Sequence, residues 1–525
     1  MKLEYPVYRD KVMGCWAGKN VGGVLGAPFE CKRQFNGDVD FYTQDLSKGP
    51  VPNDDLDLQI VWLAAVERYG RNVNASILGE YWLSFVTPNW VEYGTGKSNL
   101  RAGLLPPLSG HVDNVYRNSC GCPIRSEIWA CLAPGQPQLA AQYAREDAIV
   151  DHSEEGMYAE IFTAALQSAA FVESDPNTLI DIALSYVPAD SALARAIAEA
   201  RRCYQNQVDF REARKRVHNT APGTFGLQEW TLDEIPAKDN EGMELGTPGF
   251  DAPENVAFSM LAWLYGEGDF GRSLCLANAC GEDTDCTCAT LGATLGIIMG
   301  AKNLPEKWLA PLDDKIATLC INRTSEGVWV PATVTELTDR VVRQAPLFVG
   351  QQLCDIYAPG GVVFECRSGR GLYCPQSARY LKGLNGHKKD IDLTPAEVAA
   401  LTPYHVRYAY PAFSMDVDYR GSVTFTPGIE RRITVTLVNS FTQYQQQWAR
   451  VTLYTPPCAA VSSPRTVMLP LNNHVGAKAE CTFAFTADET APAKLELLVD
   501  VALEGRHSNG IAKVTLMAAE AETGL

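Results

Sequence analysis

The chain has 525 residues, of which 46% are hydrophobic, 20% charged and 9% aromatic. A single hydrophobic core stops growing at about 250 to 300 residues, so this length indicates more than one domain, and the composition excludes a largely disordered chain. The formal net charge is −17, with 45 basic against 62 acidic residues. This charge argues against nucleic acid as a partner, because its phosphates would be repelled.

The sequence also argues against secretion and membrane insertion. The N-terminus, MKLEYPVYRDKVMGC, carries no apolar run behind Lys2, and no later stretch reaches the roughly eighteen apolar residues of a spanning helix. We therefore expect a soluble, cytoplasmic protein without a membrane partner, whose sixteen cysteines are mostly reduced thiols. Zinc knuckles usually separate their cysteines by two residues, whereas one residue separates Cys120 from Cys122 and Cys286 from Cys288.

Residues 1 to about 345 are predicted to form an all-α domain. Apolar residues recur there at every third or fourth position, as in IVWLAAVERYG and NVAFSMLAWLYG, which is the period of an amphipathic helix. Two of the helices carry glycine at strict four-residue spacing, at Gly14, Gly18, Gly22, Gly26, Gly292, Gly296 and Gly300. Glycine costs about 1 kcal/mol relative to alanine inside a helix. The stripes therefore predict two central helices whose backbones are pressed together or against a bound group.

Two clusters of acidic residues precede apolar helices. The first, NDDLD, opens a helix that ends near Gly70, and capping by Asn53 together with the helix dipole would explain it alone. The second, GEDTD, directly precedes the second glycine-striped helix. Together the clusters would place several like charges at the starts of buried helices, where desolvation is costly. A cation between them removes this conflict.

The expected cation is Mg²⁺, with Mn²⁺ as an alternative. Carboxylate, amide and hydroxyl oxygens are hard ligands, and only His111, His152 and His218 fall in the helical half, too few for a nitrogen-rich site. One or two ions are expected, because four or more acids can hold two ions about 3.5 to 4 Å apart. That spacing suits the orientation of a sugar diol and the activation of a water molecule.

From about residue 411 the apolar period changes to two. The segments that alternate are SVTFTPG, RRITVTLVN, ARVTLYTPP, CTFAFTA, KLELLVDVAL and AKVTLM. Six short strands separated by Pro, Gly and Asn predict a β-sandwich of the immunoglobulin or fibronectin type over residues 411–525, as an accessory domain. Residues 346–410 are expected to connect the two domains and to be partly β.

Three motifs, in chain order, resemble the ADP-ribosylglycohydrolase family, which includes the dinitrogenase reductase activating enzyme and J1 crystallin. GVLGAPFE resembles the GAPxE pattern of the family and places Glu30 at its glutamate. NDDL is similar to the metal-binding TDDT pattern, and GEDTDC is similar to GGDTDT. The resemblance covers about the first 340 residues and implies a helical, metal-dependent hydrolase domain.

The resemblance implies roles for individual residues. The metal ligands would be Asn53, Asp54, Asp55, Asp283 and Asp285. Glu30 would be the acid/base group, and Asp55 would also be catalytic. Two positions depart from the family, since Asn53 stands where threonine is usual and Cys286 replaces a coordinating threonine. Because a thiol is a poor ligand for Mg²⁺, either one ion is held more weakly or water fills the second site.

Substrate contacts are expected between the metal motifs. NSCGCPIRSEIW lies where the family has a loop near the distal ribose and phosphates, and DHSEEGMYAE resembles its substrate-side helix. The substrate-binding residues expected are Asn20, Asn118, Gly121, Arg125 and His152. Two structural roles remain open, the packing of His152 at a helix start and an ion pair of Arg125 with Glu127 or Glu160. The polar stretch 231–255 is either a lid over the pocket or a surface loop.

These features predict a hydrolase that cleaves an N- or O-glycosidic bond at a ribose or another sugar. The substrate would be an ADP-ribosyl compound or a simple glycoside. Neither a basic cluster nor a phosphate-cradling loop marks a pyrophosphate site near the motifs, and the β-sandwich favours a simple glycoside. The alternative is a non-catalytic carbohydrate- or nucleotide-sugar-binding protein that has kept the fold. Retention of Glu30 and the four aspartates favours the enzyme, because unpaired buried carboxylates are costly.

Overall fold

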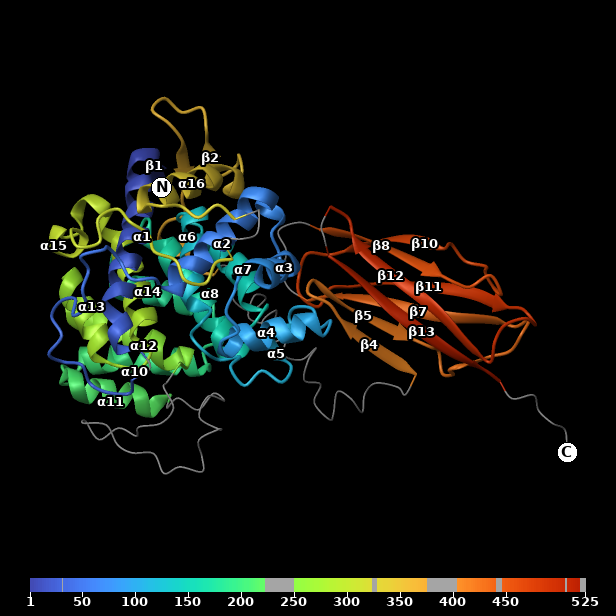
Figure 1. Ribbon diagram of the computed structural model, residues 1–525. Coiled ribbons are helices and arrows are strands. Elements are labelled where there is room, and N and C mark those ends of the chain that lie inside the picture. Colours follow the sequence, from blue (N-terminus) through green and yellow to red (C-terminus); the bar gives the residue numbers. More distant parts are fainter. Residues whose placement is uncertain are drawn as a thin grey trace. The chain divides into compact units, whose positions relative to one another are not determined.

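The computed structural model describes residues 1–30, 32–221, 250–322, 328–374, 404–440, 446–505 and 508–519. The chain divides into two compact units, Met1–Pro375 and Gln376–Leu525. The first unit is mainly helical and the second is built of strands (Figure 1). The predicted fold class, an all-α region followed by a β-sandwich, is confirmed.

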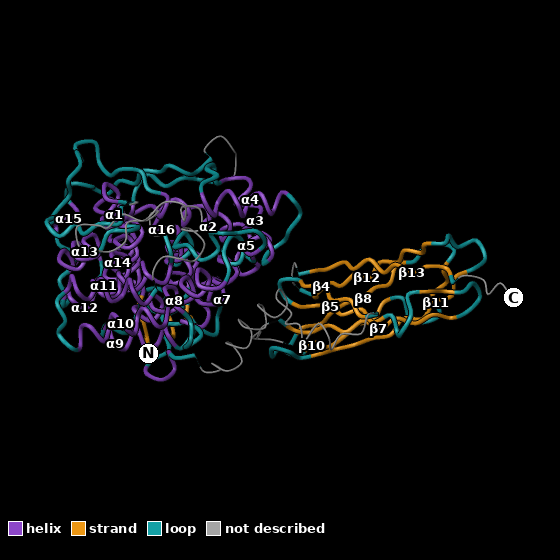
Figure 2. Tube along the Cα trace, turned by 90° about the horizontal axis from the view of Figure 1, so that it is seen from below, coloured by secondary structure: helices purple, strands orange, loops and turns teal. Residues whose placement is uncertain are grey.

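Helices make up more than half of the described length of the first unit, and the tube in Figure 2 shows them in purple. Their bounds are α1 Tyr5–Gly26, α2 Asp54–Tyr69, α3 Ala75–Phe85, α4 Val91–Arg101, α5 Leu108–His111, α6 Glu127–Leu132, α7 Pro137–Ala148, α8 Glu154–Ala170, α9 Pro176–Leu184, α10 Ala192–Gln205, α11 Phe210–Thr220, α12 Ala252–Gly266, α13 Phe270–Ala279, α14 Thr284–Met299, α15 Glu306–Leu309 and α16 Val334–Val349. None of the described helices is long and apolar enough to cross a membrane.

Helices α1 and α14 run antiparallel with their backbones in contact. A Cβ atom added at Gly18 would lie less than 3.0 Å from the carbonyl oxygen of Gly292, and one at Gly14 would meet that of Gly296 equally closely. The two predicted glycine stripes therefore face each other. Gly300 is the exception, because it caps the end of α14 with a φ of 73°. This pairing brings the C-terminal end of α1 beside the N-terminal end of α14.

The region expected to connect the two domains is partly built into the helical unit. Strands β2 Cys354–Asp355 and β3 Val363–Glu365 pair with the N-terminal strand β1 Lys2–Glu4 in the order β1-β3-β2. Both pairings are antiparallel, with Leu3 opposite Phe364. Residues 375–403, which make up most of the remainder of this region, lie outside the described residues.

The second unit contains two five-stranded sheets, with the orders β10-β8-β12-β13-β6 and β4-β5-β7-β11-β9. The strands are β4 His405–Ala409, β5 Phe413–Asp418, β6 Thr424–Phe425, β7 Glu430–Asn439, β8 Gln447–Tyr454, β9 Ala459–Val461, β10 Thr466–Leu471, β11 Lys478–Ala487, β12 Lys494–Leu503 and β13 Asn509–Ala518. Alternate residues such as Val435 in β7 and Val451 in β8 join one buried core between the sheets. The six segments predicted from the sequence all contain strands, and β4, β5, β9 and β10 were missed.

Candidate active site

A cavity of about 410 Å³ lies in the helical unit. Its wall is formed by the residues that follow α1, by the N-terminal ends of α2 and α14, and by the first turn of α4. Six residues expected at the site from the sequence line this cavity: Glu30, Asn53, Asp54, Gly121, Asp283 and Asp285. The volume falls in the range of small-molecule sites, about 300 to 1,000 Å³.

Asn53 begins α2 and also contacts the second acidic motif. Its Oδ1 accepts a hydrogen bond from the backbone N–H of Asp55 at 2.7 Å, which caps the helix. Its Nδ2 donates to Oδ2 of Asp285 at 3.2 Å. The cap expected of this residue is therefore present, and its amide nitrogen is the atom that contacts Asp285.

Of the two aspartates that follow Asn53, Asp55 is buried and Asp54 is half-buried, and both have raised pKa values. Burial and the neighbouring Asp285 raise the pKa of Asp54 to about 6, although Tyr93 Oη donates to its Oδ2 at 2.8 Å. Burial also raises the pKa of Asp55 well above its usual range, against the opposing effect of Lys19. The Oδ2 of Asp55 lies 3.7 Å from Nζ of Lys19 and has no hydrogen-bond partner among the described residues. Asp57 instead accepts the backbone N–H groups of residues 319 and 320.

The second acidic motif places two further carboxylates beside the first. Oδ2 of Asp283 accepts a hydrogen bond from the thiol of Cys120 at 2.6 Å. The other carboxylate oxygen, Oδ1, lacks a hydrogen-bond partner in the described part of the chain, as does Oδ1 of Asp285. Burial raises the pKa of Asp283 well above its usual range, and the nearby Cys120 and Asp285 raise it further.

Beside the cavity, three overlapping groups of side chains could hold a metal ion. They are Glu30 with Asp283 and Asp285, Asp55 with Asp285 and Cys286, and Cys120 with Asp283 and Cys286; within each group the candidate ligand atoms lie within 4.8 Å of one another. Asp55, Asp283 and Asp285 each retain a buried oxygen without a hydrogen bond from a described residue. Since unsatisfied buried carboxylates are costly, the donor set fits a divalent cation.

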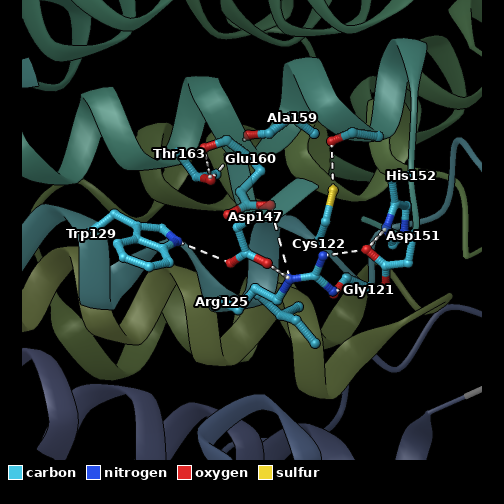
Figure 3. Close-up of polar contacts among 12 residues, drawn as sticks. Gly121, Cys122, Arg125, Trp129, Asp147, Asp151, His152, Ala159, Glu160 and Thr163 are labelled. Carbon is cyan, nitrogen blue, oxygen red and sulfur yellow. Dashed lines mark hydrogen bonds and ion pairs between the residues drawn. The ribbon is translucent and has the colours of Figure 1, made fainter. Parts of the chain in front are cut away.

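Arg125 lies behind the cavity wall in a buried ion-pair network (Figure 3). Its Nε donates to Oδ1 of Asp147 at 2.8 Å, and Nη1 donates to Oδ2 of Asp151 at 3.0 Å. Nη1 also donates to the carbonyl oxygen of Gly121 at 3.0 Å, so the network fixes a residue of the cavity wall. The expected partner Glu160 is 4.0 Å away, whereas Glu127 approaches Lys19.

The other residues expected to bind substrate are not among those that line the cavity. His152 is buried, with Nε2 at 2.8 Å from Oγ of Ser119 and Nδ1 at 3.0 Å from Asp151. Asn118 accepts the backbone N–H of Glu155 at 3.0 Å, and Asn20 donates to the carbonyl oxygen of residue 315 at 3.0 Å. These polar contacts of His152, Asn118 and Asn20 are therefore all with other residues of the protein.

A family model described as ADP-ribosylglycohydrolase matches residues 4–345. The chain belongs to the ADP-ribosylglycohydrolase family. A solved structure described as an ADP-ribosylglycohydrolase-related protein complex covers 66% of this chain and 99% of its own length, with 18% sequence identity and a TM-score of 0.42. No curated protein matches the chain. Family membership indicates a glycosyl hydrolase, and the family acts on ADP-ribosyl compounds.

Two further positions beside the acidic motifs, Gly23 and Glu282, have an unusual structural setting. A Cβ atom at Gly23 would lie 2.8 Å from Nδ2 of Asn53, so glycine leaves room for that amide. Glu282 occupies the second glycine position of GGDTDT and adopts a left-handed φ of 65°. Such a backbone costs about 1 to 2 kcal/mol for a non-glycine residue. The side chain of Glu282 forms a buried ion pair with Arg33 at 2.6 Å.

Several residues of this ADP-ribosylglycohydrolase site were missed from the sequence. Glu92 lines the cavity, and burial raises its pKa to about 7. Trp90 lines the same wall and is 48% exposed. Lys19 contacts Asp55 and Glu127 from beneath, and its isolated charge in the apolar helix GCWAGKNVGGVLG was a usable signal. Phe250 also lines the cavity, but residues 222–249, which include most of the stretch considered as a lid, lie outside the described residues.

Proposed function

We propose that this protein is a divalent-cation-dependent hydrolase that cleaves an N- or O-glycosidic bond at a ribose or another sugar. One observation carries the proposal: the carboxylates of Asp55, Asp283 and Asp285 are buried close together, Asp283 and Asp285 line a cavity of about 410 Å³, and each of the three has an oxygen without a described hydrogen-bond partner. A site built only for helix capping would satisfy these oxygens itself.

The residues proposed to hold the cation are Asn53, Asp54, Asp55, Asp283 and Asp285. Their oxygens suit Mg²⁺, with Mn²⁺ as the alternative. A bound ion would supply Lewis-acid chemistry, by ligating vicinal sugar hydroxyls and lowering the pKa of a water molecule. Lys19 lies beneath the cluster with its Nζ 3.7 Å from Asp55 and 3.3 Å from Glu127. The charge of Lys19 balances part of the negative charge of these carboxylates.

Glycoside cleavage also needs a proton donor and a base. We assign the base to Glu30, whose carboxyl can approach Asp283 and Asp285 within 4.8 Å at the exposed side of the cluster. Glu92 is the better proton donor, because burial raises its pKa to about 7 and the carboxyl then keeps its proton near neutral pH. Arg125 and the network around Asp147 and Asp151 act indirectly, by fixing Gly121 in the wall.

The cavity wall favours a ligand with flat or apolar faces. Trp90, Tyr93 and Phe250 line it, and no lysine or arginine is among the described lining residues. Aromatic rings pack against sugar or nucleobase faces. We rank an ADP-ribosyl compound first because the family acts on such compounds, and a simple glycoside second.

The test is hydrolysis of a panel of ADP-ribosylated arginine and serine peptides, aryl glycosides and N-linked glycosides, with Mg²⁺ or with EDTA. We expect ADP-ribose or a free sugar, identified by chromatography, only in the presence of metal. Release that is unchanged by EDTA would contradict the proposal. If nothing is released while calorimetry detects Mg²⁺ binding, the non-catalytic binding protein becomes the better conclusion.

Asp283→Asn provides the matched variant, because amide and carboxylate have nearly the same volume. We expect kcat/KM to fall by at least about a hundredfold, since even outer partners of metal ligands contribute about 10- to 100-fold. Saturating Mg²⁺ should stabilise the wild type by about 2.7 kcal/mol at a hundredfold excess over Kd, and the variant much less. The control is Asp175→Asn, because Asp175 caps α9 through the N–H of Thr178 and asparagine caps equally well. A fully active Asp283→Asn protein would rule out the metal assignment.

A further inference from the structure

Two cysteine thiols from distant segments meet beside the carboxylates of the cavity. Cys120 lies in the loop before α6, where its backbone N–H donates to the carbonyl oxygen of Phe250 at 2.6 Å. Cys286 lies in the first turn of α14 and lines the cavity. The thiol of Cys120 donates to Asp283 at 2.6 Å, and that of Cys286 lies 3.5 Å from Oδ1 of Asp55.

We propose that Cys120, Asp283 and Cys286 form a thiolate-containing metal site that takes a thiophilic divalent ion of the zinc class. The remaining oxygens of the cavity would serve a separate hard ion. The inference rests on the proposed function in that both place a cation among these carboxylates, but it concerns the identity of the ion and its sulfur ligands.

The chemistry of the donors separates the two kinds of ion. Thiolate sulfur favours Zn²⁺ and Co²⁺, whereas Mg²⁺ and Mn²⁺ prefer carboxylate, carbonyl and water oxygens. A candidate ligand atom from each of Cys120, Asp283 and Cys286 lies within 4.8 Å of the other two. Around a tetrahedral zinc ion with bonds of about 2.0 to 2.3 Å, ligand atoms are about 3.3 to 3.8 Å apart, so small side-chain movements would complete the site.

A second observation points to a ligand at this position. Asp283 is only 3% exposed, and its Oδ1 has no hydrogen-bond partner among the described residues. Both thiols also line a separate cavity of about 20 Å³. A cavity needs about 10 to 15 Å³ to hold one water molecule, so this space can supply a fourth ligand.

The neighbouring cysteines do not join this cluster and provide matched controls. The thiol of Cys122 donates to the carbonyl oxygen of Gly156 at 2.7 Å, and that of Cys288 to the carbonyl oxygen of Leu274 at 3.5 Å. Each follows a cluster cysteine by two residues. Each of the two short segments therefore carries one cysteine inside the cluster and one outside it.

The experiment is a Co²⁺ titration of the full-length, metal-free protein under a non-thiol reductant, followed by near-ultraviolet absorption. Thiolate-to-cobalt charge transfer absorbs there, whereas oxygen ligation does not. We expect a charge-transfer band in the wild type, because two thiolates ligate the cobalt ion. The absorbance of this band should fall to about half in Cys120→Ser or in Cys286→Ser, and the double variant should show no band. Cys122→Ser and Cys288→Ser should keep the full band.

Calorimetry with Zn²⁺ and Mg²⁺ gives a second readout in Cys286→Thr, which restores the hydroxyl usual in the family. We expect the affinity for Zn²⁺ to fall by about tenfold or more, while that for Mg²⁺ does not fall. The inference is overturned if the wild type gives no band, if the double variant keeps it, or if Zn²⁺ affinity is unchanged in Cys286→Thr. Mg²⁺-dependent hydrolysis without a band would leave the proposed function standing, and a band without any hydrolysis would leave this site standing alone.

Discussion

The buried carboxyl groups of the cavity hold protons at pH values where exposed carboxyl groups have lost them. Burial is the main cause for Glu92, whose pKa rises from 4.5 to about 7, and for Asp54, whose pKa rises to about 6. A carboxyl whose folded-state pKa lies above its unfolded value favours the folded state at low pH. This contribution is fully present below the unfolded pKa and is lost as the pH rises through the folded pKa.

We predict that Glu92→Gln reduces the pH dependence of stability. In the metal-free wild type the free energy of unfolding should fall between pH 4.5 and about pH 7, the two pKa values of Glu92. Glu92 accounts for about 3 kcal/mol of this fall in the free energy of unfolding, at 1.36 kcal/mol per pKa unit. Glutamine does not titrate, so the variant should lack this contribution. Urea unfolding with EDTA at pH 4.5 and pH 8 measures the difference.

Glu336→Gln is the control of opposite sign. Hydrogen bonds from the backbone N–H of Ala332 and from Trp329 lower the pKa of Glu336, so its contribution is present at high pH and is lost as the pH falls. Because this loss occurs below pH 4.5, Glu336→Gln should leave the fall between pH 4.5 and pH 8 nearly unchanged and should lower stability above pH 4.5 relative to more acidic pH. Parallel curves for the wild type and Glu92→Gln would show that Glu92 does not hold a proton in the folded protein.

At the scale of elements, the packing of α1 against α14 positions the site. Gly26 at the end of α1 approaches the backbone of Thr284 at the start of α14 too closely for a Cβ atom. The residues that follow α1, including Glu30, therefore lie beside Asp283 and Asp285. Helix α2 completes the arrangement through the hydrogen bond from Asn53 to Asp285.

We predict that Gly18→Ala destabilises the helical unit by about 3 kcal/mol, near the upper end for overpacked cores. The added Cβ atom would meet the backbone carbonyl of Gly292, which cannot rotate away, so the two helices must separate. Urea unfolding measures the loss, and the stabilisation by Mg²⁺ should shrink with it because the acidic motifs move apart.

Gly79→Ala in α3 is the matched control. Its added Cβ atom would lie 3.2 Å from Cδ2 of Leu100, the end of a flexible side chain. Alanine also gains about 1 kcal/mol of helix propensity, so the variant should stay within about 1 kcal/mol of the wild type. Equal unfolding midpoints for Gly18→Ala and Gly79→Ala would contradict the close packing of α1 and α14.

At the scale of the whole molecule, the two units have separate sources of stability. All the candidate metal ligands lie within Met1–Pro375. The core between the two sheets is built from residues of the second unit alone, among them Leu497 and Val499. Domains with their own cores generally unfold as separate units.

We predict two transitions in scanning calorimetry, and Mg²⁺ should raise only the transition of the helical unit. Leu497→Ala should lower the midpoint temperature of the β-sheet unit alone. The expected loss in its free energy of unfolding is about 2 to 5 kcal/mol, because Leu497 is fully buried in β12. Leu498→Ala is the control, since its neighbour Leu498 is 40% exposed and should have a small effect. A single transition that shifts with both Mg²⁺ and Leu497→Ala would show that the units unfold together.

The sequence by itself determined those features that depend on near neighbours along the chain. Apolar periods of 3.6 and 2 predicted the helical and β regions, because a side chain's face follows from its spacing. The glycine stripes predicted two central helices whose backbones are pressed together or against a bound group, because glycine is costly inside a helix, and the contact of α1 and α14 is the first of these. The acidic motifs, with the resemblance they carry, led to the family and to Glu30, Asp54 and Asp283 at one cavity.

Only the tertiary structure decided which distant side chains meet. It placed the thiol of Cys120 close to that of Cys286, whereas in the sequence the nearest cysteine to each lies two residues away. It also directed Arg125 to Asp147 and Asp151, which removed it from the cavity, and placed Glu92 in the wall instead. The physical reason is that local spacing fixes the face of an element on which a residue lies, whereas the packing of elements fixes what that face meets and how deeply its charges are buried.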